Sequence, residues 1–467
     1  MKAWKYIADL TEKATPTVLG EDEQTWIAAT DTELQSDAYL RLMWQSHVPG
    51  SGAPECITVA AIQSWEQLGY DVTEAESYLE EGFRAFADGN MGLLQTITAR
   101  IYKSLFSSPK DKDSPYWRHT VYETYAQYRA SVTLPKALVV DCTTSVFADR
   151  ITAGWRGRIV GGALGTELEG YTSAQLQSKF GDIRTYIRKP NTYNDDITYE
   201  IAFLRACMQA GNRLVDSNLI ADQWLRLIPS GWSAEQVALD NLKRGIYPPE
   251  SGLFRNAFRE WIGAQMRGAI CGQVAPGNPE LASYLAFCDG QISHHGNGVL
   301  GEVFNALLVS MAFTGSNIRQ VLDSAIAGIP SDSEYFSVLS FAREQCDHHT
   351  DWVEAWKVCE QTYKNYNWIH SYPNAAAEVI ALYFGNGNFN ETMHVIASCG
   401  QDVDCNAAQI AVALGSLLGT KMMDRVWMEP FTDEVVTYLR ADDKKMSLAA
   451  LQQDTIAVAR QMKNWKF

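Results

Sequence analysis

The feature that most constrains the fold is the segment 399–408, in which two aspartates precede a long run of small apolar residues. Asp402 and Asp404 are one residue apart, and after them apolar residues recur at the three- and four-residue spacing of a helix. Gly415 and Gly419 add no bulk, so a neighbouring helix can approach closely. The segment therefore predicts a packed helix with both carboxylates at its amino-terminal end.

These two aspartates have two interpretations. The helix dipole and the free amides favour acids in the first turn, yet two carboxylates in a packed interior repel each other unless a cation neutralises them. Oxygen ligands suit magnesium, manganese or calcium, so a buried pair indicates a divalent metal site. An isolated Asp-x-Asp pair is more often a helix cap beside a surface acid. A second acidic pair is therefore needed to favour the metal.

A second pair is present at Asp195 and Asp196, after Asn194 and before the apolar segment 201–208. It repeats the arrangement of the first pair, with acids and oxygen-bearing neighbours at the start of a helix that we expect to be buried. Paired cations a few ångströms apart commonly orient a substrate and activate water. Two such helix starts therefore predict a two-metal centre.

A glycine-rich segment, 154–169, contains Gly157, Gly161 and Gly165 at a four-residue spacing. On a helix these residues form a flat stripe along which another helix can approach. Each glycine costs a helix about 1 kcal/mol relative to alanine, and close packing is the usual compensation. Glu169 falls where this helix would end and face a cleft, although a solvated glutamate is the commoner interpretation of such a residue.

Two polar segments lie beside apolar helices. The first carries Ser293, His294, Asn297 and Gly298. Such side chains on a glycine-flexed backbone suit hydrogen bonds to hydroxyls or phosphates. In the second, His370 precedes another apolar helix. A histidine in either place is more often a surface or satisfied core residue than a ligand.

Composition narrows the partners and the compartment. The net charge of −16 and the pI of about 5.0 argue against nucleic-acid backbones and anionic membranes, because neutralising phosphates requires clustered lysine and arginine. Nine cysteines without Cys-x-x-Cys spacing indicate reduced thiols. Residues 1–10 lack the apolar core of a signal peptide, and no apolar run is long enough to span a bilayer. We therefore expect a cytoplasmic protein.

The amino-terminal part of the chain shows helices without evident chemistry. Segments 57–68, 72–86 and 90–105 carry apolar residues at helical spacing. The polar, proline-bounded stretch 107–115 is the best candidate boundary, although it also fits a surface loop. We interpret residues 1–115 as a helical region that packs on the main body.

Taken in order over about 155–419, five segments resemble motifs of the ADP-ribosylglycohydrolase family. The matching segments are the glycine helix and its acid at 161–169, Asn194-Asp195-Asp196, Met266-Arg267, Ser293-His294, and 401–405. Each motif alone is weak, but five in the family's own order are specific.

The resemblance implies an all-helical orthogonal bundle, with a catalytic domain at 116–467. It also implies a binuclear Mg²⁺ or Mn²⁺ site at the bottom of a cleft, where a bond at the anomeric carbon of a ribose is cleaved. The implied metal ligands are Asn194, Asp195, Asp196, Asp402, Asp404 and Cys405. The implied catalytic residues are Glu169, Asp196 and Asp404, and the implied substrate-binding residues are Glu169, Ser293, His294, Asn297, Gly298 and His370. The substrate would be an ADP-ribosyl or ribosyl small molecule, or an ADP-ribosylated protein.

The chain departs from the family pattern at several positions. Gly162 stands where many members carry aspartate, Asn194 where they carry threonine, and Cys405 where they carry threonine or serine. An asparagine oxygen can replace a hydroxyl ligand, whereas a thiol is a poor ligand for magnesium. The family's glycine-rich phosphate-contacting segment before Met-Arg is missing from 261–265. Two alternatives therefore stay open: a hydrolase of small N-ribosyl or O-furanosyl compounds without ADP, and a protein that binds ADP-ribose without cleaving it.

Overall fold

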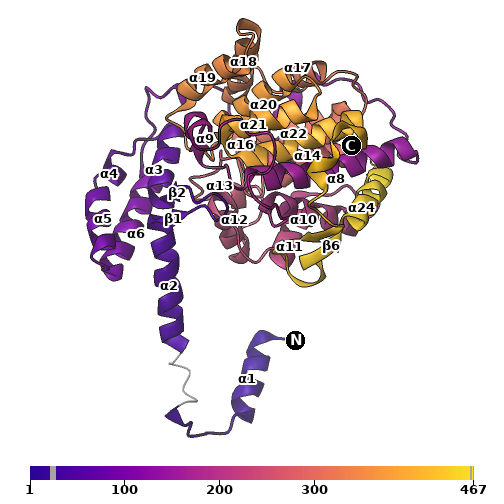
Figure 1. Ribbon diagram of the computed structural model, residues 1–467. Coiled ribbons are helices and arrows are strands. Elements are labelled where there is room, and N and C mark those ends of the chain that lie inside the picture. Colours follow the sequence, from indigo (N-terminus) through magenta and orange to yellow (C-terminus); the bar gives the residue numbers. More distant parts are fainter. Residues whose placement is uncertain (22–27, 463–464, 466–467) are drawn as a thin grey trace.

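Helices make up most of the computed structural model, which describes residues 1–21, 28–462 and 465 (Figure 1). The strands among these residues form three short antiparallel pairs: β1 (Ser46–His47) with β2 (Pro54–Glu55), β3 (Tyr171–Thr172) with β4 (Gly400–Gln401), and β5 (Glu434–Val436) with β6 (Lys445–Ser447). The predicted all-helical class is therefore confirmed.

The amino-terminal region consists mainly of helices. Its elements are α1 (Ala3–Lys13), α2 (Ala28–Trp44), α3 (Ile57–Gln67), α4 (Thr73–Glu76), α5 (Leu79–Ala87) and α6 (Met91–Ser107). Helices α3 to α6 lie along one side of the main body, while α2 projects away from it (Figure 1). The stretch 107–115 is a loop that returns to these helices, since Asp71 donates its backbone amide to the Pro109 carbonyl at 3.0 Å.

The remaining helices, including short 3-10 helices labelled η, form the main body. They are η3 (Pro115–Arg118), α7 (Tyr125–Ser131), α8 (Ser145–Gly165), α9 (Ser173–Phe180), α10 (Asp195–Ala210), α11 (Ser217–Leu227), α12 (Ser233–Lys243), α13 (Glu250–Leu253), η4 (Gln265–Arg267), α14 (Gly268–Val274), α15 (Pro279–Gly290), α16 (Asn297–Ala312), α17 (Ile318–Ala327), α18 (Glu334–His348), α19 (Trp352–Tyr363), α20 (Ser371–Gly385), α21 (Phe389–Cys399), α22 (Val403–Leu418), η5 (Thr420–Met422), α23 (Arg425–Met428), η6 (Ala441–Lys444) and α24 (Leu448–Met462).

Helices α8 and α22 cross at the centre of the body, and glycine makes this approach possible. A Cβ atom added at Gly161 would lie 2.4 Å from the Ala407 carbonyl carbon, and one at Gly165 would lie 2.0 Å from the Asp404 nitrogen. No real side chain fits at such distances. The predicted glycine stripe is confirmed, and its partner is the helix that begins at the Asp402 segment.

The amino-terminal helices are joined to the body through buried polar contacts. Ser64 on α3 donates its hydroxyl to the Ala257 carbonyl at 2.8 Å and accepts from the Trp261 indole at 3.1 Å. Farther along the chain, Tyr116 donates its hydroxyl to Glu260 at 2.9 Å. Because the Ser64 contacts lie in the interior, α3 is fixed on the body.

The carboxyl-terminal part combines the β5–β6 hairpin with α24, which packs on the centre of the fold. The Trp155 indole on α8 donates to the Thr455 hydroxyl on α24 at 2.9 Å, and both residues are buried. Among the described residues, no helix has the length and apolar character required to cross a bilayer.

Candidate functional site

The two acidic helix starts meet, although they are about two hundred residues apart in sequence. Helix α10 begins with Asp195 and Asp196, and the Asn194 side chain caps it by accepting from the Asp196 amide at 2.8 Å. Helix α22 begins with Asp402 at its N-cap and Asp404 in its first turn. Asn194 also donates its side-chain amide to Asp404 at 3.0 Å, so the two starts are in direct contact.

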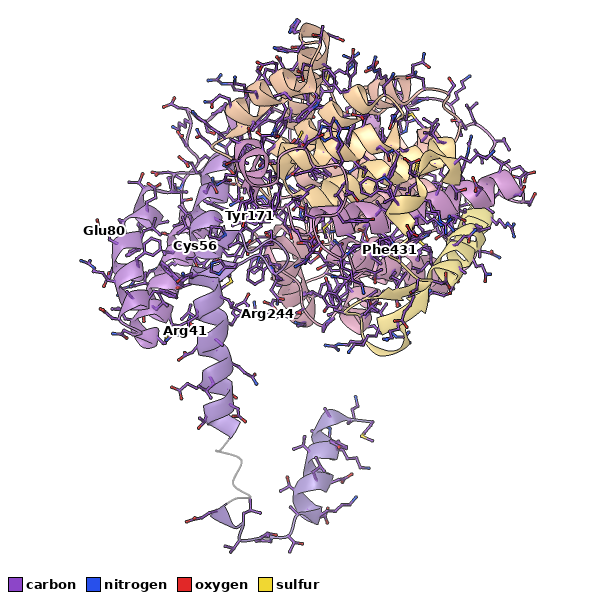
Figure 2. The ribbon with its side chains drawn as sticks, viewed as in Figure 1. Arg41, Cys56, Glu80, Tyr171, Arg244 and Phe431 are labelled. Atoms are coloured by element: carbon purple, nitrogen blue, oxygen red, sulfur yellow. The ribbon has the colours of Figure 1, made fainter. Side chains whose placement is uncertain are left out.

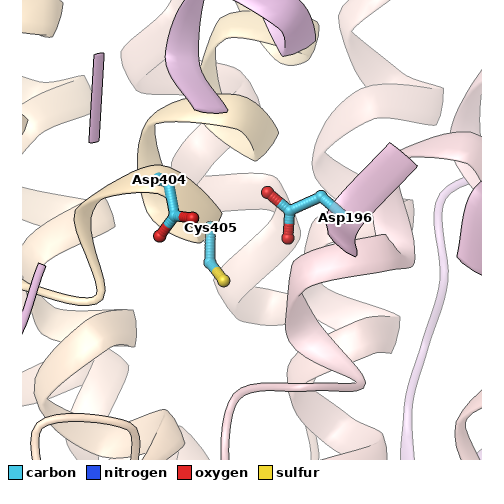
Figure 3. Close-up of side chains that lie close together, drawn as sticks. All are labelled: Asp196, Asp404 and Cys405. Atoms are coloured by element: carbon cyan, nitrogen blue, oxygen red, sulfur yellow. The ribbon is translucent and has the colours of Figure 1, made fainter. Parts of the chain in front are cut away.

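Asp404 is common to two groups of potential metal ligands. One ligand atom from each of Asp196, Asp404 and Cys405 lies within 4.8 Å of the others, and the same holds for Glu169, Asp402 and Asp404. Figure 3 shows Asp196 and Asp404 on facing helix ends, with Cys405 beside Asp404. Four of the residues proposed as ligands or catalytic groups are thus brought together around Asp404.

A short strand pair fixes Glu169 beside this cluster. Strand β3, which follows Glu169, pairs with β4, which precedes Asp402. Gly170 donates its amide to the Gln401 carbonyl at 2.9 Å. Gly400 has φ +73°, and a Cβ there would lie 2.2 Å from the Tyr171 carbonyl, so the turn requires glycine.

Asn374 on α20 fixes the start of α22 from the other side. Its side-chain oxygen accepts from the Asp402 amide at 3.0 Å and from the Asn406 side chain at 2.7 Å. Its amide nitrogen donates to the Trp368 carbonyl at 2.8 Å. The aspartate segment is therefore held by side chains as well as by helix packing.

The acidic cluster has unsatisfied oxygens that fit a cation. Both carboxylate oxygens of Asp196, Oδ1 of Asp402 and Oδ1 of Asp404 are buried without a hydrogen-bond partner among the described residues. Burial raises the pKa of Asp196 and of Asp402 well above the ordinary value, and the Asp404 charge raises both further. Uncompensated buried carboxylates are costly, and divalent cations are the ions that such oxygen sets bind.

The pKa values of two other groups at the site are also raised. Asp195 faces the cavity described below, where the surrounding protein excludes enough water to raise its pKa to about 6, helped by the Asp404 charge. Burial raises the pKa of the Cys405 thiol well above its usual value, and the neighbouring aspartates add to the shift. A neutral thiol is a poor ligand for a hard cation.

The two family departures at Gly162 and Asn194 lie against each other. A Cβ at Gly162 would meet the Asn194 side-chain nitrogen at 3.0 Å. In this structure the Asn194 oxygen is used to cap α10, and its nitrogen donates to Asp404. The role of Asn194 as a metal ligand therefore stays a prediction.

A buried ion pair lies behind Asp196. Glu200, one turn farther along α10, pairs with Arg158 on α8, and both side chains are fully buried. Burial raises the pKa of Glu200 to about 8 even though the Arg158 charge opposes the shift. Asp196 is also close enough to the Arg158 guanidinium for its negative charge to favour the charged form of Arg158. Arg158 thus supplies a positive charge to the interior side of the cluster.

A cavity of about 440 Å³ opens above the acidic cluster. Its acidic lining residues are Glu55, Glu169, Asp195, Glu235, Asp402 and Asp404. Its aromatic lining residues are Tyr193, Tyr199, Trp232, Trp368 and Tyr438. The volume and the aromatic walls suit a small organic ligand bound next to the carboxylates.

The sequence did not indicate most of these walls. Residues 46–50 and Glu55 of the amino-terminal region line the cavity, although no chemistry was expected there. Trp232 is the N-cap of α12 and Glu235 lies in its first turn, where an acid is ordinary and gives no signal of a pocket. Burial raises the pKa of Glu235 to about 7, and the positive charge of Arg267 only partly opposes this shift.

Five of the predicted substrate-binding residues are not among the described residues that line the cavity. They are Ser293, His294, Asn297, Gly298 and His370. Arg267 donates to the Ser293 hydroxyl at 3.0 Å, and that hydroxyl lies 2.8 Å from Nδ1 of His294. Asn297 donates to Glu260 at 3.1 Å, and the His370 side chain accepts from the Tyr372 amide at 3.2 Å. Here these residues hold neighbouring elements together.

Comparison with known proteins agrees with this architecture. A family model for ADP-ribosylglycohydrolase matches residues 143–461. An uncharacterized protein of Archaeoglobus fulgidus is 21% identical over 296 residues, which cover 59% of this chain and 90% of that protein. A solved structure described as an ADP-ribosylglycohydrolase-related protein complex superposes with a TM-score of 0.50 at 18% identity, covering 68% of this chain and 99% of that one.

An all-helical body whose acidic helix starts converge on one cavity is the architecture expected from the sequence resemblance. The family match covers well over half of the chain and includes every acidic residue of the Asp404 cluster. The chain belongs to the ADP-ribosylglycohydrolase family. The amino-terminal wall of the cavity, residues 46–55, lies outside the matched segment.

Proposed function

We propose that the protein is a hydrolase that cleaves the glycosidic bond at the anomeric carbon of a ribosyl or ADP-ribosyl substrate, with two divalent cations, Mg²⁺ or Mn²⁺, as cofactors. One observation carries the proposal: Asp404 belongs to both groups of close ligand atoms, with Asp196 and Cys405 on one side and Glu169 and Asp402 on the other. If two cations are bound, Asp404 would be the residue that helps to hold both of them.

The four aspartates would hold the ions, and the unsatisfied oxygens of Asp196, Asp402 and Asp404 support this assignment. When bound, paired cations bind oxygen groups of the substrate and lower the pKa of a bound water. Asp195 and Asp196 would approach from α10, and Asp402 and Asp404 from α22. The N-cap contact of Asn194 with Asp404 would keep the two helix starts in register.

Glu169 would hold the proton that the reaction moves. It lies in the cavity wall, and burial raises its pKa well above the ordinary value, with further contributions from the Asp404 and Asp402 charges. A carboxyl group that keeps its proton near neutral pH can donate it to the leaving atom of a glycosidic bond. Positioning of substrate and proton donor in one cavity supplies much of the remaining rate enhancement.

The cavity lining favours the phosphate-free substrate among the alternatives. Among the described lining residues there is no lysine or arginine, and His47 is the residue there that can become cationic. A pyrophosphate bound in such a cavity would face carboxylates instead of the charged donors that usually bind it. A small N-ribosyl or O-furanosyl compound is therefore our second candidate substrate.

Asp404→Ala tests the assignment, with Asp113→Ala, a change at an exposed aspartate, as the matched control. Mn²⁺ binding is measured by calorimetry, and sugar release is measured from ADP-ribosylated arginine and from a simple riboside. We expect Asp404→Ala to abolish turnover and weaken Mn²⁺ binding while the melting curve stays cooperative. Unchanged turnover in this variant would refute the proposal, and ADP-ribose binding without product in the parent would favour a binding protein.

A further inference from the structure

The amino-terminal region is built into the wall of the cavity through the β1–β2 hairpin. The Tyr171 hydroxyl, beside the loop that carries Glu169, donates to the Ser51 carbonyl in the hairpin turn at 3.1 Å. In Figure 2, Tyr171 lies at the junction between the amino-terminal helices and the main body. A Cβ at Gly50 would lie 2.1 Å from the Thr166 carbonyl oxygen, so the turn is seated directly on the end of α8.

This hairpin carries an acid into the cavity next to an aromatic ring. Glu55 on β2 is partly buried and accepts hydrogen bonds from Trp232 and from the Ser46 hydroxyl. Trp232 is the N-cap of α12, and Glu235 lies in the first turn of the same helix. The cavity therefore has a second acidic region, formed by Glu55 and Glu235 around Trp232 and distinct from the Asp404 cluster.

The charges on these two acids are only partly balanced. Glu235 lies 3.3 Å from Arg267, but Arg267 also pairs with Asp289 and lies 3.6 Å from Glu302, so one guanidinium serves three carboxylates. Ion pairs with a lysine or arginine are not recorded for Glu55 in the described part of the chain. Two cations at the Asp404 cluster would be matched by the aspartates there and would not neutralise Glu55 or Glu235. Since the pKa of Glu235 is about 7, a cationic ligand beside it would favour its charged form.

A negative, aromatic-walled region that shares a cavity with the reacting end of a sugar suits a cationic planar group. An aromatic ring face attracts a cation, and a carboxylate at its edge adds a charge-assisted contact. Trp232, Trp368 and Tyr193 supply such faces in the same cavity. An anionic group would meet repulsion from Glu55 and Glu235 and would find no fixed positive charge among the lining residues described.

We propose that Glu55, Trp232 and Glu235 form a leaving-group subsite that selects a positively charged, phosphate-free aglycone, and that the amino-terminal hairpin supplies its specificity-determining acid. This inference rests on the proposed glycosidic hydrolysis and names the substrate class. In the balanced reaction, water adds its hydroxyl to the anomeric carbon while the carbon–nitrogen bond breaks. The bond electrons pass to the cationic nitrogen, so the aglycone leaves as a neutral base and needs no proton from Glu169, whose donor role applies to substrates with an uncharged leaving atom. The proton of the water passes to an ionised aspartate of the site or to solvent.

Two ribosides with the same ring test the charge preference. Nicotinamide riboside has a cationic aglycone, whereas nicotinic acid riboside carries an added carboxylate that cancels the charge. NAD⁺ adds a pyrophosphate to the first compound. With Mn²⁺ present, we expect kcat/KM for nicotinamide riboside to exceed both others by at least tenfold, because the acidic region attracts the first and repels the added anions.

Glu55→Gln keeps the size of the side chain and removes its charge. We expect it to reduce the preference for nicotinamide riboside over nicotinic acid riboside at least tenfold, with Mn²⁺ affinity unchanged. Glu76→Gln, at an exposed glutamate on α4, is the matched control and should leave the ratio as in the parent. Equal kcat/KM for the two ribosides in the parent, or an unchanged ratio in Glu55→Gln, would overturn the subsite.

Binding of the 1-methylnicotinamide cation separates this inference from the hydrolase proposal. Calorimetry on the full chain should show binding that weakens at least tenfold in Glu55→Gln and does not depend on turnover. Glu55-dependent binding without hydrolysis of any riboside would retain the subsite and remove the hydrolase. If the protein hydrolyses ribosides regardless of aglycone charge and does not bind this cation, the hydrolase proposal stands and the subsite proposal is refuted.

Discussion

Gly165→Ala is the most direct test of how the fold positions the acidic cluster. The new methyl group would lie 2.0 Å from the Asp404 nitrogen and 2.2 Å from its Cα, where ordinary contacts begin at 3.4 Å. The obstacle is backbone, so no side chain can rotate away to make room. Helix α22 must therefore move away from α8 by an ångström or more at the residue that both ligand groups share.

Two magnitudes follow from this displacement. Overpacking of a close helix contact costs about 1–3 kcal/mol of stability, so the melting temperature should fall. A misplacement of about 1 Å at reacting groups can cost roughly 10²-fold in rate, so kcat should fall by about that factor. Mn²⁺ affinity should fall as well, because Asp404 would leave the 4.8 Å groups that it forms with Asp196 and Asp402.

Gly161→Ala and Gly92→Ala are the matched controls. Gly161 is one turn away and would meet Ala407 and Ala408 instead of Asp404, so it should lower stability with a smaller loss of Mn²⁺ affinity. Gly92 on α6 has nothing within 4 Å of an added Cβ, so alanine there should be neutral or stabilise by up to about 1 kcal/mol. Circular dichroism melts, Mn²⁺ calorimetry and riboside turnover give the three readouts. If Gly165→Ala keeps parental Mn²⁺ affinity and turnover, the close helix approach does not position Asp404.

Three further outcomes are expected. The pKa of Asp195 is raised from 3.8 to about 6, so between these pH values the folded metal-free protein holds a proton that the unfolded chain releases, and stability falls as pH rises. Asp195→Asn should therefore match the parent melting temperature near pH 4 and exceed it near pH 7, both measured in EDTA. Equal melting temperatures of parent and variant at both pH values would contradict this. Gly50→Ala should lift the hairpin off Thr166, lowering stability by about 1–3 kcal/mol and riboside turnover with it, whereas parental turnover would argue against a role for the hairpin. Arg158→Met should lower the free energy of unfolding by about 3–5 kcal/mol, because it leaves Glu200 unpaired in the interior. The double variant with Glu200→Leu should recover most of that loss in thermal melts. If it does not, packing and not charge dominates at this pair.

Much of the central architecture could be predicted because its signals are local. Acids at helix starts and glycines four residues apart are visible in a single sequence, and the structure joins them at one helix crossing. The order of these segments along the chain then pointed to the family. What the patterns did not contain was the partner of each element, which here is Asp404 for Gly165 and Asn374 for Asp402.

The cavity walls could not be predicted for a different reason. Glu55 lies on a two-residue strand, and Trp232 and Glu235 lie in an ordinary first turn, so no periodicity distinguishes them. Polar residues beside glycine suggested a binding loop at Ser293 and His294, and in the structure these side chains make buried contacts to Arg267 and to each other. Their role in substrate binding stays a prediction. Polar residues that stabilise a core and those that line a pocket have the same composition, and packing over long sequence distances decides between them.

The glycine stripe and the acidic cluster make sense as one arrangement. Each is unfavourable alone, since glycine weakens α8 and buried carboxylates without partners weaken the cluster. Alanine at Gly165 would raise the helix propensity of α8 but would push Asp404 away from that helix. Arg158, on the same helix, supplies a positive charge behind Asp196. The glycines that weaken α8 as a helix are thus the residues whose close contacts with α22 bring Asp196, Asp402 and Asp404 together. We infer that the carboxylate geometry, and not the stability of the bundle, is what this helix crossing preserves.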